Sequence, residues 1–264
     1  MMRVETFSTL REAAAALVPG ACYLGGGTLA MRALNHGEGG YDRVLRTTDP
    51  GLREIRAEAE RVVIGAGVTL AQVIAHRDLE FLAPVARSIG GPAVRNMGTV
   101  GGNLFAPHPY GDLAAALLAL DGEARMADGG AMPLADLLAR RDGPAGLVAA
   151  VTVARPRPGE FRYRKVSRTR PKGASVLSIS AWLPLSAGRI GAARVAYAAM
   201  GPAPMRVTAV ERALDGATLD PQGVARAVAA AGDGISPPDD ALASGWYRAE
   251  VVGVHLRRLL LGEG

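Results

Sequence analysis

Short apolar segments alternate with polar, glycine-containing turns through the first 155 residues of the chain. Thr9 and Glu12 have the spacing of a capping box, which predicts a helix that begins there and ends at Pro19 and Gly20. Beyond it, the periodicity predicts short helices over 28–34, 69–76 and 112–120 and strands over 21–24, 43–46, 54–57, 62–64, 123–127 and 147–153. This mixture of short elements is typical of an α+β fold.

A different pattern begins after the segment 155–159, whose sequence RPRPG is the best candidate for a domain boundary. Alternation of apolar and polar residues over 161–166, 176–183 and 193–199 predicts an antiparallel sheet, and helices are expected over 206–214, 222–231 and 241–261. The last of these helices carries apolar residues at helical spacing that we expect to be packed; they are Trp246, Tyr247, Val251, Val254, Leu256 and Leu259. With 264 residues, the chain is long enough for two domains with buried cores.

The formal net charge is +5, and the basic excess is concentrated between positions 155 and 172. This tract contains eight Arg or Lys residues and one acidic residue, Glu160. Such a tract can be the electrostatic footprint of a nucleic-acid-binding protein. The tract lacks the recognisable fold signature of that class, however. A solvated face, or an edge that faces an anion or a partner protein, is the favoured interpretation, and no nucleic-acid partner is expected.

Cysteine and histidine usage limits the metal chemistry of the chain. Cys22 is the single cysteine, so no disulfide can form within the chain and no iron–sulfur cluster, which needs several thiolates, is expected on it. Cys22 lies in an apolar run and is expected to be a small buried residue. The four histidines lack metal-ligand spacing, and no metal site is expected.

The apolar runs of the chain are short. The N-terminal residues contain no apolar signal core, and the longest apolar run, around 113–120, is too short to cross a bilayer. We therefore expect no membrane span and a cytoplasmic location.

Two glycine-rich segments have a composition suited to binding a diphosphate. Several backbone N–H groups must converge on such a group, and glycine allows both the close approach and the unusual dihedral angles that this requires. The first segment, LGGGT at 24–28, follows a predicted strand. The second, TVGGN at 99–103, lies within the glycine- and proline-punctuated segment 88–112, which we expect to be a functional loop.

Neither glycine segment has the pattern of a Rossmann or Walker loop. Each of them alone is equally well explained as a tight turn. The pair, about 75 residues apart, suggests a cofactor held between two lobes.

The ordered series of motifs resembles the flavin-binding subunit or domain of the molybdenum hydroxylases, a family that includes xanthine dehydrogenases and carbon monoxide dehydrogenases. The resemblance is most specific in RNMGTVGGN and the following PHPYGDLAAALLALDG, and it extends over YLGGGT, FRYRKVSRTRPKGASVLSISAWL, AMGPAPMRVTAVERAL and SGWYRAEVVGVHLRRLL. It implies a two-lobed FAD-binding fold of the vanillyl-alcohol-oxidase or MurB-like (PCMH) type over 1–155, with lobes of about 1–55 and 56–155. A smaller C-terminal α+β domain with an antiparallel sheet is implied over 160–264.

The resemblance also implies the residues of an FAD site. Those that would wrap the diphosphate are Leu24, Gly25, Gly26, Gly27, Thr28 and Leu29 in the first loop and Thr99, Val100, Gly101, Gly102 and Asn103 in the second. Family members often carry Asn or His where this chain has Gly27, and some carry Glu at Leu29. Contacts that those side chains make in relatives would be absent here or replaced by backbone.

Four further residues have an implied role beside an ordinary alternative. Asp112 would contact the sugar and phosphate region of FAD, or only cap the helix that follows it. Lys165 would approach the flavin as the catalytic residue, or be one more member of the basic tract. Ile89 and Val148 would flank the isoalloxazine or its ribityl chain, or simply belong to the core. His108 is expected to be a neutral loop histidine, and FAD to be bound non-covalently.

The function that the resemblance implies is electron transfer. FAD would receive electrons from iron–sulfur clusters on a small partner subunit and pass them to NAD or another acceptor, and the molybdopterin cofactor would lie on a large partner subunit. One alternative is a self-sufficient FAD-dependent oxidase or reductase, although the C-terminal half offers no compact cluster of substrate-side residues. The other is a basic anion- or nucleic-acid-binding protein, which would be colourless.

Overall fold

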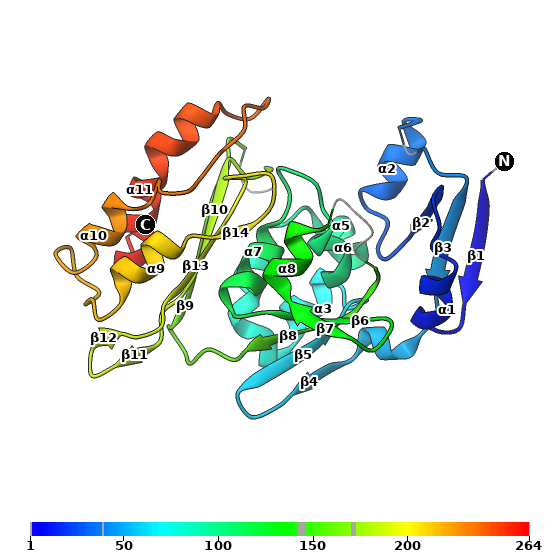
Figure 1. The fold of residues 1–264 in the computed structure, drawn as a ribbon, viewed down its shortest axis with the longest axis horizontal. Helices are drawn as coiled ribbons and strands as arrows, with labels where there is room; N and C mark the ends of the chain where they lie inside the picture. The colour runs from blue at the N-terminus through cyan, green and yellow to red at the C-terminus, as the bar shows by residue number, and fades with distance from the viewer. Residues whose placement is uncertain (1, 39, 142–145, 170–172, 264) are drawn as a thin grey trace.

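The computed structural model describes residues 2–38, 40–141, 146–169 and 173–263, and it shows an α+β protein with three main β-sheets of three, five and four strands (Figure 1). The first lobe, at the right of Figure 1, has a parallel sheet in the order β1-β3-β2. Its elements are β1 (Arg3–Phe7), α1 (Leu10–Ala15), β2 (Ala21–Tyr23), α2 (Ala30–Asn35), β3 (Arg43–Thr47) and the 3-10 helix η1 (Pro50–Arg53). The predicted capping box is confirmed, because the Thr9 hydroxyl accepts from the Glu12 amide and the Glu12 carboxylate accepts from the Thr9 amide.

The second lobe contains an antiparallel sheet in the order β4-β5-β8-β6-β7. Its strands are β4 (Ile55–Ala57), β5 (Arg61–Gly65), β6 (Glu123–Met126), β7 (Ala131–Pro133) and β8 (Val148–Ala154). Its helices are α3 (Leu70–Ala75), η2 (Arg77–Leu82), α4 (Ala83–Arg87), α5 (Pro92–Met97), α6 (Val100–Leu104), α7 (Asp112–Ala119) and α8 (Leu134–Ala139). Helix α7 is buried at every residue, and every residue of its sequence DLAAALLA after Asp112 is apolar.

The C-terminal part has an antiparallel sheet in the order β14-β13-β10-β9, as the alternating pattern predicted. Its elements are β9 (Phe161–Val166), β10 (Leu177–Trp182), β11 (Leu185–Ser186), β12 (Arg189–Ile190), β13 (Arg194–Ala198), β14 (Met205–Arg206), α9 (Thr208–Leu214), α10 (Ala225–Ala229) and α11 (Gly245–Leu261). Helices α9–α11 cover one face of this sheet, where Leu177 and Ile179 join their core, and the opposite face lies against α7 (Figure 1). Helix α7 thus joins the second lobe and the C-terminal sheet.

The structure differs from the sequence predictions where a proline or threonine, taken as a sign of a loop, begins a helix, and where an element is exposed. The segment 88–112 is not one loop: Pro92 stands in the first turn of α5, and Thr99 caps α6 by accepting a hydrogen bond from Gly102. Strand β1 was not predicted, because it is mostly exposed and Val4 is 60% exposed. Cys22 is half-buried, so the expectation of a buried thiol was wrong.

The packing predicted for α11 is confirmed for Leu256 and Leu259, which are buried, and wrong for Trp246, which is 72% exposed, and for Tyr247 and Val254, which are also exposed. The helix has a single covered face, and that face is occupied by Val252, Leu256 and Leu259. Trp246, Tyr247 and Val254 lie away from this face and stay exposed.

The two lobes meet where the glycine segments lie. A methyl group added at Gly26 would lie 1.9 Å from the backbone oxygen of Met97, and one added at Gly25 would lie 3.0 Å from the Thr99 hydroxyl oxygen. Only hydrogen at these α-carbons allows the first lobe to approach the second so closely.

Replacing Gly26 with alanine should lower the free energy of unfolding by about 1–3 kcal/mol, because the two backbones must move apart to admit the methyl group. The measurement is the midpoint of urea unfolding, with Gly232→Ala as the control, since a methyl group at Gly232 would meet no heavy atom within 4 Å. Equal midpoints for the two variants would contradict the close lobe contact.

Candidate functional site

The candidate site lies where the two glycine segments, far apart in sequence, share one place in the structure. Besides the contacts of Gly25 and Gly26, a methyl group at Gly98 would lie 3.8 Å from the Thr28 side chain. On the other side of the second segment, a methyl group at Gly101 would lie 2.8 Å from the Ala66 side chain. The second segment is therefore held between the first segment and the turn after β5.

The two segments differ in the backbone donors that they offer. Among the described residues, the amides of the first segment from Gly25 to Leu29 donate no hydrogen bond to another residue, although Leu24 donates to the Leu45 carbonyl. In the second segment, by contrast, the Val100, Gly101 and Asn103 amides donate to carbonyl oxygens of Val68, Ala66 and Thr99. A run of glycine-rich amides without an acceptor fits a diphosphate group. The first segment would supply most of the N–H groups, and its glycines also allow the close approach of the second segment.

Asp112 and Lys165 form a buried ion pair at the junction of the second lobe and the C-terminal sheet. The Lys165 ammonium lies 2.9 Å from a carboxylate oxygen of Asp112, and the side chains are 12% and 6% exposed. Lys165 also donates to the Ser88 carbonyl at 3.0 Å, and the Ser175 hydroxyl donates to the second Asp112 oxygen at 2.6 Å. The position before α7 is Gly111, and Asp112 is the first residue of the helix, so it is not the N-cap residue.

Tyr163 extends this polar cluster. Its hydroxyl lies 2.8 Å from the Ser88 hydroxyl oxygen, and the Ser88 hydroxyl in turn lies 2.7 Å from the Val85 carbonyl. Because Ser88 must donate its single proton to that carbonyl, Tyr163 is the donor to Ser88. Burial, followed by the nearby Asp112 carboxylate, raises the pKa of Tyr163 well above its usual value, so the phenol stays protonated.

Asn103, Ile89 and Val148, which were also predicted as site residues, lie outside the polar cluster of Asp112 and Lys165. The Asn103 side-chain oxygen accepts from the Ala114 amide at 3.2 Å and so joins α6 to the first turn of α7. Ile89 is half-buried against the core of the second lobe, and Val148 is 5% exposed within that core. The structure gives Val148 a packing role and brings neither residue into the polar cluster.

Ser88, Ser175 and Tyr163 were not predicted as site residues. Ser88 is the C-cap residue of α4, Ser175 lies in the link before β10 and Tyr163 lies in β9, and serine is common at turns for local reasons. No pattern in the sequence joins them to Asp112, and only the packing of α7 against the C-terminal sheet brings them together.

Several basic residues of the tract 155–172 form hydrogen bonds with other parts of the chain. Arg162 donates to the Leu259 and Leu260 carbonyls at the end of α11, and Arg164 donates to the Glu263 carbonyl and to His255. Cations are favoured at helix C-termini, so this arrangement stabilises α11. Arg168 is exposed, while Arg170 and Lys172 lie outside the described residues.

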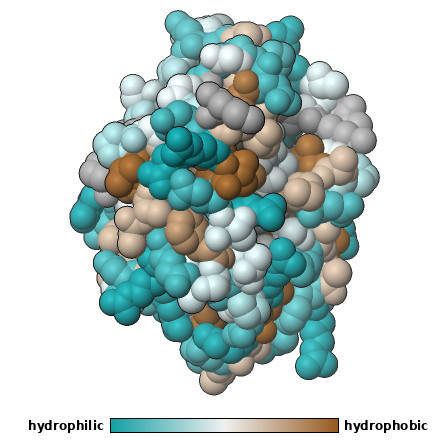
Figure 2. Space-filling model, turned by 90° about the vertical axis from the view of Figure 1, so that its right-hand side faces the viewer, coloured by the Kyte–Doolittle hydropathy of each residue, from teal (hydrophilic) through white to brown (hydrophobic). Residues whose placement is uncertain are grey.

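Apolar residues on the outer side of the first lobe are scattered. Figure 2 shows the side of the molecule that carries the first lobe, with apolar residues in small separate patches among hydrophilic ones. Two hollows of about 310 and 390 Å³ lie elsewhere, one beside Arg168 and Tyr247 and one beside Pro202 and Arg206, and neither is lined by the glycine segments. None of the helices in the described ranges is long and apolar enough to cross a membrane.

Two family models match the chain. The FAD binding domain in molybdopterin dehydrogenase matches residues 1–153, and the CO dehydrogenase flavoprotein C-terminal domain matches residues 162–262.

Individual relatives are similar over most of their length. The 6-hydroxypseudooxynicotine dehydrogenase complex subunit alpha of Paenarthrobacter nicotinovorans is 28% identical over 228 residues, which cover 80% of this chain and 75% of that protein. The carbon monoxide dehydrogenase medium chain of Afipia carboxidovorans is 29% identical over 224 residues, which cover 77% of this chain and 75% of that protein.

Solved structures share the fold. A chain of reconstituted CO dehydrogenase from Oligotropha carboxidovorans superposes with a TM-score of 0.89 at 23% identity, over 98% of this chain and 96% of that one. A chain of quinoline 2-oxidoreductase from Pseudomonas putida 86 gives a TM-score of 0.87 at 20% identity, over 100% of this chain and 96% of that one. The resemblance noted in the motifs is thus confirmed, and the chain belongs to the family of flavoproteins that join the FAD binding domain of molybdopterin dehydrogenases to the CO dehydrogenase flavoprotein C-terminal domain.

Proposed function

We propose that this chain is the flavoprotein subunit of a molybdenum hydroxylase complex and that it transfers electrons through non-covalently bound FAD. The observation that carries the proposal is the run of unpaired amides in the first glycine segment, held against the second segment in a chain of this family. Relatives named as the medium chain or the alpha subunit of dehydrogenase complexes support the assignment to a larger assembly. The proposed division is 1–155 for the FAD-binding domain, with lobes of about 1–55 and 56–155, and 160–264 for the C-terminal domain.

Particular residues would hold the cofactor. The amides of Gly25, Gly26 and Gly27 would bind the diphosphate, with Thr28 beside them, and Gly101 and Gly102 would let the second segment approach it. Asp112 would hold Lys165 in place, and Lys165 would present its remaining N–H group to the flavin. Bound FAD supplies a carrier that accepts electrons one at a time and passes them on singly or in pairs.

The proposed partners rest on the family and on relatives that are subunits of dehydrogenase complexes, and the residues of this chain agree with them. A single half-buried cysteine cannot ligate an iron–sulfur cluster, and no group of three His, Cys, Asp or Glu side chains in the described ranges could hold a metal ion. We therefore place the clusters on a small partner subunit and the molybdopterin cofactor on a large one. NAD is one candidate for the final acceptor.

The purified chain should be yellow, with the absorption bands of oxidised flavin. Acid precipitation should release FAD into the supernatant and leave a colourless pellet, because the link is non-covalent. The measurement is the visible spectrum before and after precipitation. A colourless protein that takes up no added FAD would overturn the proposal, and a yellow pellet would overturn the non-covalent link.

Replacing Lys165 with alanine should leave FAD bound but slow the reduction of the flavin by about tenfold to a hundredfold, because the lost charge-assisted hydrogen bond would have stabilised the negative charge of the reduced ring. The rate is measured by stopped-flow absorbance after mixing the oxidised protein with dithionite. Arg157→Ala is the matched control, because Arg157 is an exposed cation of the same tract. An unchanged rate in the Lys165 variant would count against a role of this residue at the flavin.

A further inference from the structure

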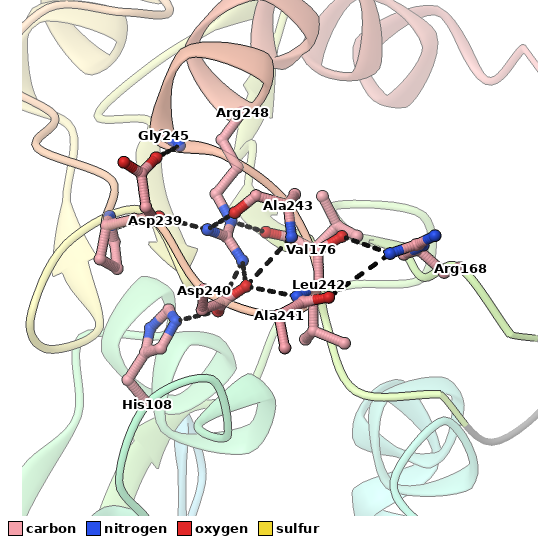
Figure 3. Close-up of polar contacts among 11 residues, drawn as sticks. His108, Arg168, Val176, Asp239, Asp240, Ala241, Leu242, Ala243, Gly245 and Arg248 are labelled. Atoms are coloured by element: carbon pink, nitrogen blue, oxygen red, sulfur yellow. Dashed lines mark hydrogen bonds and ion pairs between the residues drawn. The ribbon is translucent and has the colours of Figure 1, made fainter.

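Arg248 is a buried cation that uses every one of its donors. Its side chain is 0% exposed, and its five N–H groups bind the Val176, Pro238 and Ala243 carbonyls and both carboxylate oxygens of Asp240 (Figure 3). A guanidinium held in this way has one orientation available. Arg248 therefore fixes the loop that precedes α11 against the start of β10.

Asp240, which Arg248 holds in place, contacts the second lobe through His108. One of its oxygens accepts from the Leu242 and Ala243 amides, and the other lies 2.6 Å from Nε2 of His108 (Figure 3). Burial by itself would raise the pKa of Asp240, but hydrogen bonds from Arg248, His108 and the two amides outweigh it and hold the pKa well below its usual range. The carboxylate is thus ionised at neutral pH and accepts a hydrogen bond from the imidazole.

His108 belongs to the segment between α6 and α7, and this segment is held by the C-terminal part at several points. Its far end is Asp112, which binds Lys165 and Ser175. Between them, a methyl group added at Gly111 would lie 2.9 Å from the Pro204 ring. Near its beginning, the Ala106 carbonyl accepts from Arg141, which also donates to the Pro202 carbonyl.

The same segment follows directly on the second glycine segment. Asn103 ends that glycine segment, lies within α6 and binds the first turn of α7 through its side chain. A shift of His108 would therefore be passed to both Asn103 and Asp112, because the chain that joins it to each of them is short.

We propose that His108 and Asp240 are positioning residues of the flavin site. Asp240, fixed by Arg248, holds the link between the second glycine segment and Asp112 at a defined place, so that His108 and Asp240 contribute to FAD affinity although neither side chain touches FAD. This inference rests on the proposed function. It goes beyond it by naming a hydrogen bond, between His108 and Asp240, that joins the two parts of the chain and on which FAD binding depends.

The test compares FAD dissociation constants of the full chain and its variants, measured by the fluorescence of added FAD. His108→Ala should weaken FAD binding by about threefold to tenfold, the effect of losing one hydrogen bond. His108→Gln places an amide N–H near the position of Nε2 and should restore the wild-type constant. The control is His76→Ala, because the His76 side chain is 34% exposed and its ring accepts a hydrogen bond only from the Asp78 amide of its own lobe.

The rescue by glutamine separates a positioning role from simple loss of packing, since both variants remove the imidazole ring. The visible circular dichroism of the bound flavin, which reports the geometry of its surroundings, should change in His108→Ala and not in His108→Gln. Equal constants for His108→Ala and the wild type would overturn the positioning role and leave the proposed function intact, and so would a glutamine variant as weak as the alanine variant. A wild-type chain that binds no FAD would overturn both.

Discussion

The buried ion pair between Asp112 and Lys165 is the interaction on which the rest of the site depends. It joins the first residue of α7 to strand β9, and the two side chains are only 6% and 12% exposed. Removing one partner of such a pair leaves a poorly solvated charge, which costs about 3–5 kcal/mol. The second lobe and the C-terminal sheet therefore cannot rotate against each other without unpairing these charges. Because the rest of α7 is apolar, the burial of the helix and its ion pair favour the same arrangement.

A constraint of space acts at the other boundary. The first lobe reaches the second through backbone contact at Gly26 and Met97, where no side chain would fit, and the second glycine segment rests on Ala66 through Gly101. Most amides of the second segment donate hydrogen bonds within the chain, whereas the amides of Gly25 to Leu29 donate none among the described residues. The glycines thus have two different tasks. In the first segment they leave donors available and allow close contact with Met97 and Thr99, and in the second Gly101 lets a well-bonded backbone pack against Ala66.

Much of this architecture could be predicted from the sequence, and the limits have physical causes. The C-terminal strands and α7 were predictable because each has one dominant pattern, alternation for the strands and a continuous apolar run for the helix. Helices α5 and α6 were missed because Pro92 and Thr99, which begin them, are also loop formers. The site residues Asp112 and Lys165 could be singled out by resemblance, but their pairing could not. They are 53 positions apart, and each had a sufficient local explanation as a helix cap or as one of a run of basic residues.

The pairing changes what Lys165 can do. A lone ammonium group would act on a bound anion over a long range, but a carboxylate 2.9 Å away cancels most of that field at a distance. What remains is a directed N–H group, since the other two are used by Asp112 and the Ser88 carbonyl. The Ser175 hydroxyl donates a hydrogen bond to the second oxygen of Asp112, so that both oxygens of this carboxylate have a donor. A flavin beside Lys165 would therefore meet a short-range, oriented donor, whose direction is set by residues of both the second lobe and the C-terminal sheet. The C-terminal part is on this argument a component of the cofactor site, and its loss would alter the chemistry of the flavin as well as the stability of the chain.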